Sequence, residues 1–172
     1  MIYAGIGSRQ TPSHVLDLMQ RIGEICGRQG DVLRSGAANG ADSAFEAGCD
    51  MAGGRKEIFL PWNNFNGRSS MERGVWTGYD PRAHAMAKQF HPNWGALTSG
   101  GRALHARNMH QILGMNLDKP ADLVICWTPN GSGIGGTGQA IRVANAHRIP
   151  VHDLGKQEVY DKYIAAVSRH PA

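Results

Sequence analysis

Residues 125–140 read ICWTPNGSGIGGTGQA, an apolar strand that runs into a loop with five glycines and then into a helix. Glycine has no Cβ, so the backbone of such a loop can take positive φ values and approach a ligand closely. The helix that follows directs free N–H groups and a partial positive charge at the loop. This combination predicts a phosphate-binding loop. We assign its ligand contacts to Gly133, Gly135, Gly136, Thr137 and Gly138.

The rest of the chain alternates short apolar runs with amphipathic segments. Strands are expected at residues 2–6, 31–34, 56–60, 121–127 and 149–152, and helices at 13–28, 41–52, 101–115, 136–147 and 156–169. Strands that are apolar throughout, each followed by a helix, are typical of a parallel sheet covered on both faces. We therefore predict an α/β fold in a single domain, residues 1–172. It is a Rossmann-like, doubly wound parallel sheet of about five strands in the order 3-2-1-4-5.

One segment departs from this alternation. Residues 61–98 mix polar, glycine-rich sequence with aromatic residues, and we expect one helix within them, near residues 81–90. This irregular, aromatic-rich excursion could serve as a lid over a ligand, as a contact between subunits, or as both.

The composition is that of an ordinary soluble protein, with 41% apolar and 19% charged residues. The net charge of +4 fits either a mildly basic surface or an anionic ligand. No basic run reaches the about five or six residues of a nucleic-acid-binding arm. The three cysteines lie in apolar runs without a CxxC pair, which predicts buried free thiols in a reducing cytoplasm. We see no signal peptide and no apolar run near the ~18 residues of a membrane span, so we expect a cytoplasmic protein without a membrane partner.

A second glycine loop follows the first strand. Gly7, Ser8 and Arg9 combine a flexible turn, a hydroxyl and a guanidinium group, which suits a phosphate or a carboxylate. The same residues could instead form a turn with an ion-paired surface arginine. Because right-handed crossovers place every strand-to-helix loop at one edge of the sheet, the two glycine loops should meet there.

The loop after the second strand, residues 35–42, reads SGAANGAD, and its small residues allow the backbone to approach a ligand. We assign ligand contacts here to Ser35, Gly36 and Asn39, and a ribose contact to Asp42. Glu46 lies one turn further along the same helix face, so Asp42 and Glu46 could share acid–base work. Alternatively, Asp42 stabilises the helix dipole and Glu46 belongs to a solvated helix face.

Three further residues complete the predicted site. Arg107 and Asn108, on the helix before the strongest strand, could reach the same edge of the sheet, although a lone helical arginine is usually a surface residue. Trp127, or an aromatic residue of 61–98, could stack on a nucleobase. The sequence has no Walker loop, no GxGxxG opening a first βαβ unit, no zinc-ligand spacing and no GxSxG elbow, so we expect neither a cofactor nor a metal ion.

Four segments in order resemble the SLOG superfamily, the Rossmann-like group that includes the DprA/Smf proteins and the Lonely Guy phosphoribohydrolases. They are residues 5–9, 35–42, 105–109, and the Gly135-Gly136-Thr137 loop with Ala140 and Ala144 beyond it. Together they span residues 1–153, and the chain looks most like small SLOG proteins of the YspA/YpsA type, some of them from phages. The resemblance implies a nucleotide or nucleotide-derived ligand at the loop edge. It also implies a homodimer, which is common among such proteins.

The resemblance bears on chemistry as well. In Lonely Guy enzymes, an arginine and a glutamate three residues after a Gly-Thr pair carry N-glycosidic hydrolysis. Arg107 stands in the arginine position, but Ala140 stands where the glutamate would be. Glu46, Asp42 or Glu72 would then have to supply the carboxylate. The DprA proteins bind single-stranded DNA, for which this chain shows no obvious basic stripe.

Three functional hypotheses follow. The first is binding of a nucleotide-type ligand, for sensing or sequestration, with phosphate held by Ser8, Arg9 and the backbone of 133–138. The second is an N-glycosidase acting on a nucleoside 5′-monophosphate, with Arg107, Glu46 and Asp42 as catalytic residues. The third is a DprA-like protein that binds single-stranded DNA. The first is preferred, because Ala140 replaces the glutamate that the second would need.

Overall fold

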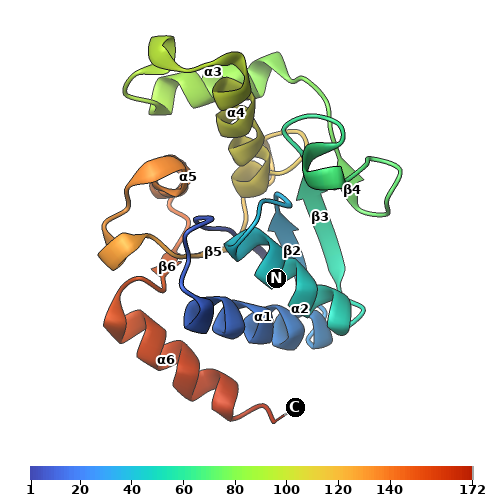
Figure 1. Ribbon diagram of the computed structural model, residues 1–172, viewed down its shortest axis with the longest axis vertical. Coiled ribbons are helices and arrows are strands. Elements are labelled where there is room, and N and C mark those ends of the chain that lie inside the picture. The colour runs from blue at the N-terminus through green and yellow to red at the C-terminus, as the bar shows by residue number, and fades with distance from the viewer. Residues whose placement is uncertain (172) are drawn as a thin grey trace.

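The computed structural model describes residues 1–171, in which six parallel strands form one sheet (Figure 1). The strands are β1 (Ile2–Gly5), β2 (Val32–Ser35), β3 (Arg55–Phe59), β4 (Val75–Trp76), β5 (Leu123–Cys126) and β6 (Val151–Asp153). The helices are α1 (Ser13–Arg28), α2 (Ala41–Met51), α3 (Pro81–Phe90), α4 (Ser99–Leu113), α5 (Gly135–Ala146) and α6 (Gln157–Ser168). The strand order is β4-β3-β2-β1-β5-β6.

The five strands expected from the sequence pair in the expected order, and a sixth strand corrects their number. This strand, β4, lies inside the excursion and extends the sheet beyond β3. Its two residues, Val75 and Trp76, pair with Ile58 and Phe59. So short a strand shows no apolar run in the sequence, and only its long-range pairing with β3 defines it.

The helix predicted within the excursion is confirmed as α3. The Asp80 side chain accepts a hydrogen bond from the backbone N–H of Arg82, which caps the first turn, and Pro81 occupies the first helical position. Both features favour a helix start. Helix α4 begins at Ser99, two residues before the expected start, because the Thr98 side chain caps it through the N–H of Gly101.

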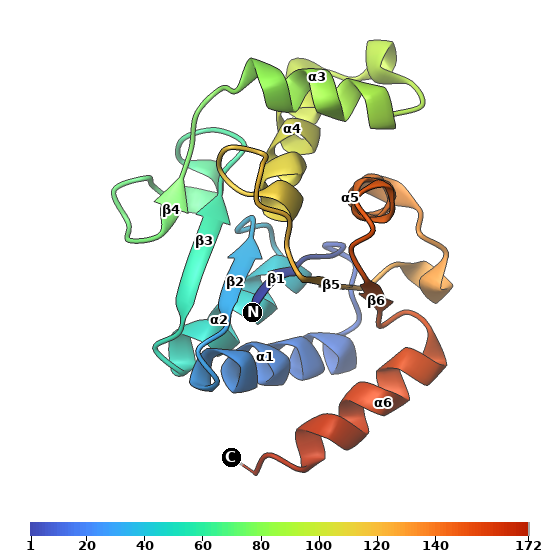
Figure 2. The same ribbon diagram turned by 180° about the vertical axis from the view of Figure 1, so that it is seen from behind.

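Alternate strand residues face two separate cores. Tyr3, Leu33 and Ile125 pack with α1, α2 and α6, whereas Ala4 and Val124 pack with α3, α4 and α5. Figure 2 shows these two groups of helices on opposite sides of the sheet. Both faces of the sheet are therefore covered, as strands that are apolar throughout require.

The prediction that the three cysteines are buried free thiols is confirmed. Cys26, Cys49 and Cys126 are all buried and free. Burial raises the pKa of the Cys126 thiol well above its ordinary value, which keeps this side chain protonated. Among the helices of residues 1–171, none combines the length and the apolar character needed to cross a bilayer.

Candidate functional site

The carboxyl ends of β1 and β5 lie next to each other, and their loops leave the sheet toward opposite faces. β1 leads to α1 on one face, whereas β5 leads to α5 on the other (Figure 1). In a doubly wound sheet, this divergence opens a crevice that ligands occupy. A cavity of about 450 Å³ lies at this point. Its volume is within the range of small-molecule sites.

Most residues assigned from the sequence line this cavity. They are Gly7, Ser8, Arg9, Asp42, Arg107, Asn108, Trp127, Gly135, Gly136 and Thr137. Six assigned residues lie outside its lining, namely Ser35, Gly36, Asn39, Glu46, Gly133 and Gly138. The loops after β1 and β5 thus meet at one edge of the sheet, as right-handed crossovers lead one to expect.

The loop after β1 carries Ser8 and Arg9. Its glycine is required by packing, since a Cβ on Gly7 would lie 2.7 Å from the Cβ of Ala41 on α2. The Ser8 carbonyl accepts a hydrogen bond of 2.6 Å from the Thr11 hydroxyl, which holds the turn. The Arg9 side chain remains exposed beside the cavity, where it can reach an anionic ligand.

The first turn of α5 forms another wall of the cavity, through Gly135, Gly136 and Thr137. The residue at the N-cap position, Ile134, makes no side-chain cap hydrogen bond. The first N–H groups of a helix have no partner within it and carry the positive end of the helix dipole. This wall is therefore suited to an anionic group such as a phosphate.

A buried network fixes the shape of the glycine loop. The Thr128 hydroxyl accepts a hydrogen bond of 2.9 Å from the N–H of Gly133 and donates one to Asp153 at the end of β6. A Cβ on Gly138 would lie 2.0 Å from the Gly133 carbonyl oxygen, so the loop and the helix meet only because this residue is glycine. Sequence reasoning missed Thr128 and Asp153. Their only signal was a polar residue at the end of each of two neighbouring strands.

Asp42 lies in the first turn of α2 and is 3% exposed. Burial raises the pKa of its carboxyl from 3.8 to about 6, although the Arg107 charge and the N–H groups of Ala38 and Gly7 oppose this shift. A carboxyl with such a pKa inside a cavity is typical of functional sites. It can exchange a proton near neutral pH.

Arg107 reaches the cavity from α4 and is 7% exposed. One guanidinium nitrogen donates to the carbonyl oxygens of Gly36 (2.6 Å) and Phe59 (3.1 Å). The guanidinium carbon lies 5.5 Å from the centre of the Phe65 ring, which suits a cation–π contact. Burial lowers the pKa of Arg107, and the Asp42 charge opposes this shift. The arginine is thus a fixed positive charge next to Asp42.

Phe65, in the excursion, forms part of the wall of this cavity. Phe65 lines it, and the Asn66 side-chain amide donates a hydrogen bond of 2.9 Å to the carbonyl oxygen of Ala37. Among the aromatic residues of 61–98, Phe65 is the one that lines this cavity. The sequence offered several aromatic residues in this segment and no means of choosing among them.

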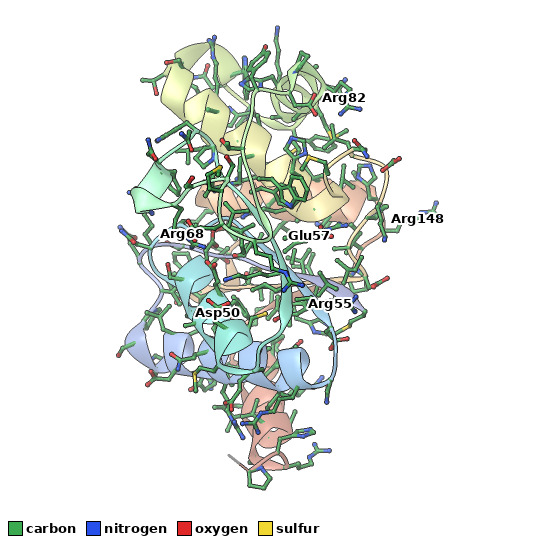
Figure 3. The ribbon with its side chains drawn as sticks, turned by 90° about the vertical axis from the view of Figure 1, so that its right-hand side faces the viewer. Asp50, Arg55, Glu57, Arg68, Arg82 and Arg148 are labelled. Atoms are coloured by element: carbon green, nitrogen blue, oxygen red, sulfur yellow. The ribbon has the colours of Figure 1, made fainter. Side chains whose placement is uncertain are left out.

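Glu46 is held in an ion-pair network outside the cavity lining. Its carboxylate accepts hydrogen bonds from Lys56 Nζ (2.9 Å) and from Arg68 (2.7 and 2.8 Å). Burial alone would raise the pKa of Glu46, but the hydrogen bonds from Arg68 and Lys56 outweigh it and lower the pKa. Figure 3 shows Arg68 in the segment that precedes β4. Glu46 therefore ties this segment to α2.

The remaining assigned residues in the loop after β2 lie outside the cavity lining, and two of them contact other parts of the protein. The Ser35 hydroxyl donates a hydrogen bond of 2.6 Å to the Gly5 carbonyl of β1. The Gly36 carbonyl holds Arg107, and Asn39 is exposed. Within residues 1–171, no group of three or more His, Cys, Asp or Glu side chains is arranged to hold a metal ion.

No protein-family profile matches this sequence, and no curated protein matches it either. Solved structures share its fold at low sequence identity. DNA processing protein A (DprA) from Helicobacter pylori, described with a single-stranded DNA binding mode, is 19% identical and superposes with a TM-score of 0.61. The match covers 89% of this chain and 64% of that one, so this chain spans about two thirds of the length of the DprA structure.

The molybdenum cofactor carrier protein from Chlamydomonas reinhardtii is similar in two structures. One is 17% identical with a TM-score of 0.55, and the match covers 98% of this chain and 84% of that one. The other is 16% identical with a TM-score of 0.56, and the match covers 96% and 83%. At these identities the similarity shows a shared fold, and the chain has the Rossmann-like α/β fold of these two proteins.

Proposed function

We propose that this chain is a SLOG-type protein that binds a nucleotide or nucleotide-derived ligand in the cavity between β1 and β5. The observation that supports the proposal is the convergence on one cavity of two elements whose chemistry suits an anion. The exposed Arg9 and the uncapped first turn of α5 both line it. Such a pair can hold one phosphate group from two sides.

The other walls suit the rest of a nucleotide. Trp127 and Phe65 offer aromatic faces on which a base can stack, and Asp42 offers a carboxylate for ribose hydroxyls. The proposal assigns no ligand contact to Glu46, whose carboxylate is already paired with Arg68 and Lys56. Ser35, Gly36, Gly133 and Gly138 support the loops that form the cavity.

The experiment that tests the proposal is a thermal-shift panel. It compares nucleosides, their 5′-mono- and diphosphates, and cyclic and ADP-ribose derivatives. A ligand that binds only the folded state raises the melting temperature in proportion to the logarithm of its concentration. We expect phosphorylated compounds to raise it and the matching nucleosides to do so much less. The absence of a shift with every phosphorylated compound would overturn the proposal.

Arg9→Ala is expected to weaken binding of the best phosphorylated ligand by about tenfold or more, because a charge-assisted hydrogen bond is lost. Binding of the matching nucleoside should change little. The control is Arg148→Ala, since Arg148 follows the opposite end of α5 and its side chain points outward in Figure 3. Equal losses for nucleotide and nucleoside, measured by calorimetry, would show that Arg9 does not contact the phosphate.

A second candidate, N-glycosidic hydrolysis of a nucleoside 5′-monophosphate, is supported by Asp42. Its carboxyl, with a pKa of about 6, lies in the cavity near the buried Arg107. Asp42 could activate the attacking water, while Arg107 stabilises the negative charge that develops on the departing base. Release of free base that is lost in Asp42→Asn would support this function. Release that survives the substitution would remove Asp42 from the chemistry.

A third candidate, binding of single-stranded DNA, is supported by the structural similarity to DprA. Its signature is an affinity that falls steeply as salt rises, because bound phosphates release their counterions. Titration of a labelled oligonucleotide at low and at physiological salt tests this candidate. A flat response to salt, or no binding at low salt, would exclude it.

A further inference from the structure

A second cavity of about 450 Å³ lies apart from the first, between the end of β3, the loop from β4 into α3, and the end of α4. No residue lines both cavities. The second one is framed by Phe59 and Leu60 at the end of β3, and by Met115 and Asn116 beyond α4. Figure 2 shows β3 and β4 side by side, with the chain running from β4 up into α3.

Aromatic side chains form the walls of this second cavity. Trp76 and Tyr79 are 49% and 75% exposed, although both are large and apolar in part. Deeper in, the buried Phe59 ring stacks on the His110 ring, with 5.6 Å between their centres and 24° between their planes. Exposed aromatic rings around a hollow are typical of surfaces that receive a planar ligand.

Two polar atoms belong to residues of the same lining. Asp80 Oδ2 lies 3.7 Å from His110 Nε2, and the two side chains are 16% and 12% exposed. This distance is too long for a hydrogen bond, so each of the two atoms can still accept a hydrogen bond from a ligand. The other ring nitrogen, His110 Nδ1, lies 3.1 Å from the Gly114 carbonyl oxygen, which can only accept. In the neutral ring, Nδ1 therefore carries the proton and Nε2 is an acceptor.

The charge of this cavity differs from that of the first. Arg82, the arginine of its lining, already donates to both carboxylate oxygens of Asp80, at 2.9 and 3.1 Å. Figure 3 shows Arg82 near the top of the molecule in that view. These hydrogen bonds lower the pKa of Asp80, so the group remains a carboxylate. The lining therefore offers a ligand two hydrogen-bond acceptors, Asp80 Oδ2 and His110 Nε2, between aromatic walls. It does not resemble a phosphate site.

We propose that this second cavity binds a planar heteroaromatic amine, which stacks against Trp76 and Tyr79 and donates hydrogen bonds to Asp80 Oδ2 and His110 Nε2. An exocyclic amino group supplies two N–H donors, so it can serve both acceptors. The site goes beyond the proposed function, because its ligand needs no phosphate and touches none of the residues of the first cavity. An amino-substituted ring alone should suffice for binding.

The experiment compares 9-methyladenine with 9-methylpurine, which differ only in the exocyclic amino group. Binding is followed by NMR through the indole N–H signals of the four tryptophans. Trp76→Phe and Trp127→Phe variants assign the signals of the second and the first cavity. We expect 9-methyladenine to shift the Trp76 signal saturably, and 9-methylpurine to bind about tenfold more weakly. A nucleotide that shifts only the Trp127 signal reports on the first cavity, so the two proposals can fail separately.

Two variants probe the walls and the acceptors. Tyr79→Ala should weaken 9-methyladenine binding by about tenfold, the usual effect of losing one stacking partner. Asp80→Asn should weaken it by about tenfold while keeping the cap of α3, because asparagine caps helices as well as aspartate does. The control is Met71→Ala, at a side chain that is 92% exposed and outside the lining.

Three results would overturn the proposal. The first is a Trp76 signal that does not move up to the solubility limit of 9-methyladenine. The second is undiminished binding in both Tyr79→Ala and Asp80→Asn. The third is a wild-type protein that does not bind 9-methyladenine and forms a dimer, which Tyr79→Ala converts to a monomer. That result would assign the aromatic surface to a second copy of the chain.

Discussion

Asp42→Asn is expected to make the protein more stable than the wild type at pH 7.5, by about 2 to 3 kcal/mol. The reason is the burial of the carboxyl, which is 3% exposed and has a pKa raised from 3.8 to about 6. At pH 7.5 the wild type must hold this group as a buried anion. Asparagine has the same shape and carries no charge.

The sign follows from the protons that each state binds. Between pH 3.8 and about 6, the folded state holds a proton on Asp42 that the unfolded state has lost. The free energy of unfolding contributed by this group therefore falls as pH rises through that window, and stays at its lower value above it. The gap between the variant and the wild type should accordingly close as pH is lowered from 7 to 4.

Urea denaturation at several pH values measures this gap. The control is Asp17→Asn on α1, because Asp17 is exposed and its substitution should leave the stability nearly unchanged. A variant that is less stable than the wild type at pH 7.5 would show that attraction to Arg107 outweighs the burial of the charge.

The same substitution connects stability with function. In the proposed site Asp42 contacts ribose, so Asp42→Asn should bind the ligand more weakly although it folds more stably. Charged groups that destabilise a fold and line a cavity are typical of functional sites, where activity and stability oppose each other. A variant that gains stability and keeps full affinity would separate Asp42 from the ligand.

The order of the main strands could be predicted because strands and helices alternate along the chain, which is typical of a doubly wound parallel sheet. The glycine loop, Arg9 and Trp127 could be placed at one edge of the sheet for the same reason, since topology alone brings them together. β4 could not be predicted, because two residues carry no periodicity. Its existence depends on the pairing of Val75 with Ile58 across the sheet.

Glu46 shows that helical spacing alone does not tell which residues of a helix line a cavity. Asp42 and Glu46 lie four residues apart on α2, so the sequence placed them on one face as a carboxylate pair. The cavity reaches only the first turn of that helix, and Glu46 forms an ion pair with Arg68 of the excursion. A contact between residues so distant in sequence leaves no local pattern. The hydrogen bond between Thr128 and Asp153 could not be predicted for the same reason, since a polar residue at each strand end does not reveal its partner.

Gly48→Ala is expected to destabilise the protein by about 3 kcal/mol or more, because α1 and α2 pack closely at this point. A Cβ on Gly48 would lie 1.9 Å from the carbonyl oxygen of Gln20 and 2.7 Å from the backbone nitrogen of Glu24. Both are backbone atoms of α1, so no side-chain rotation can relieve the clash. The helices would have to move apart and open the core that holds Phe45.

The matched control is Gly100→Ala in the first turn of α4, where the nearest atom to an added Cβ is 3.8 Å away. Both substitutions gain the higher helix propensity of alanine, at most about 1 kcal/mol, but only Gly48→Ala meets backbone. Urea denaturation should therefore move the two variants in opposite directions. Loss of less than about 1 kcal/mol in Gly48→Ala would mean that α2 shifts freely on α1. Since Asp42 lies in the first turn of α2, such a shift would also move the carboxylate within the cavity, and ligand affinity measured on the same variant would report it.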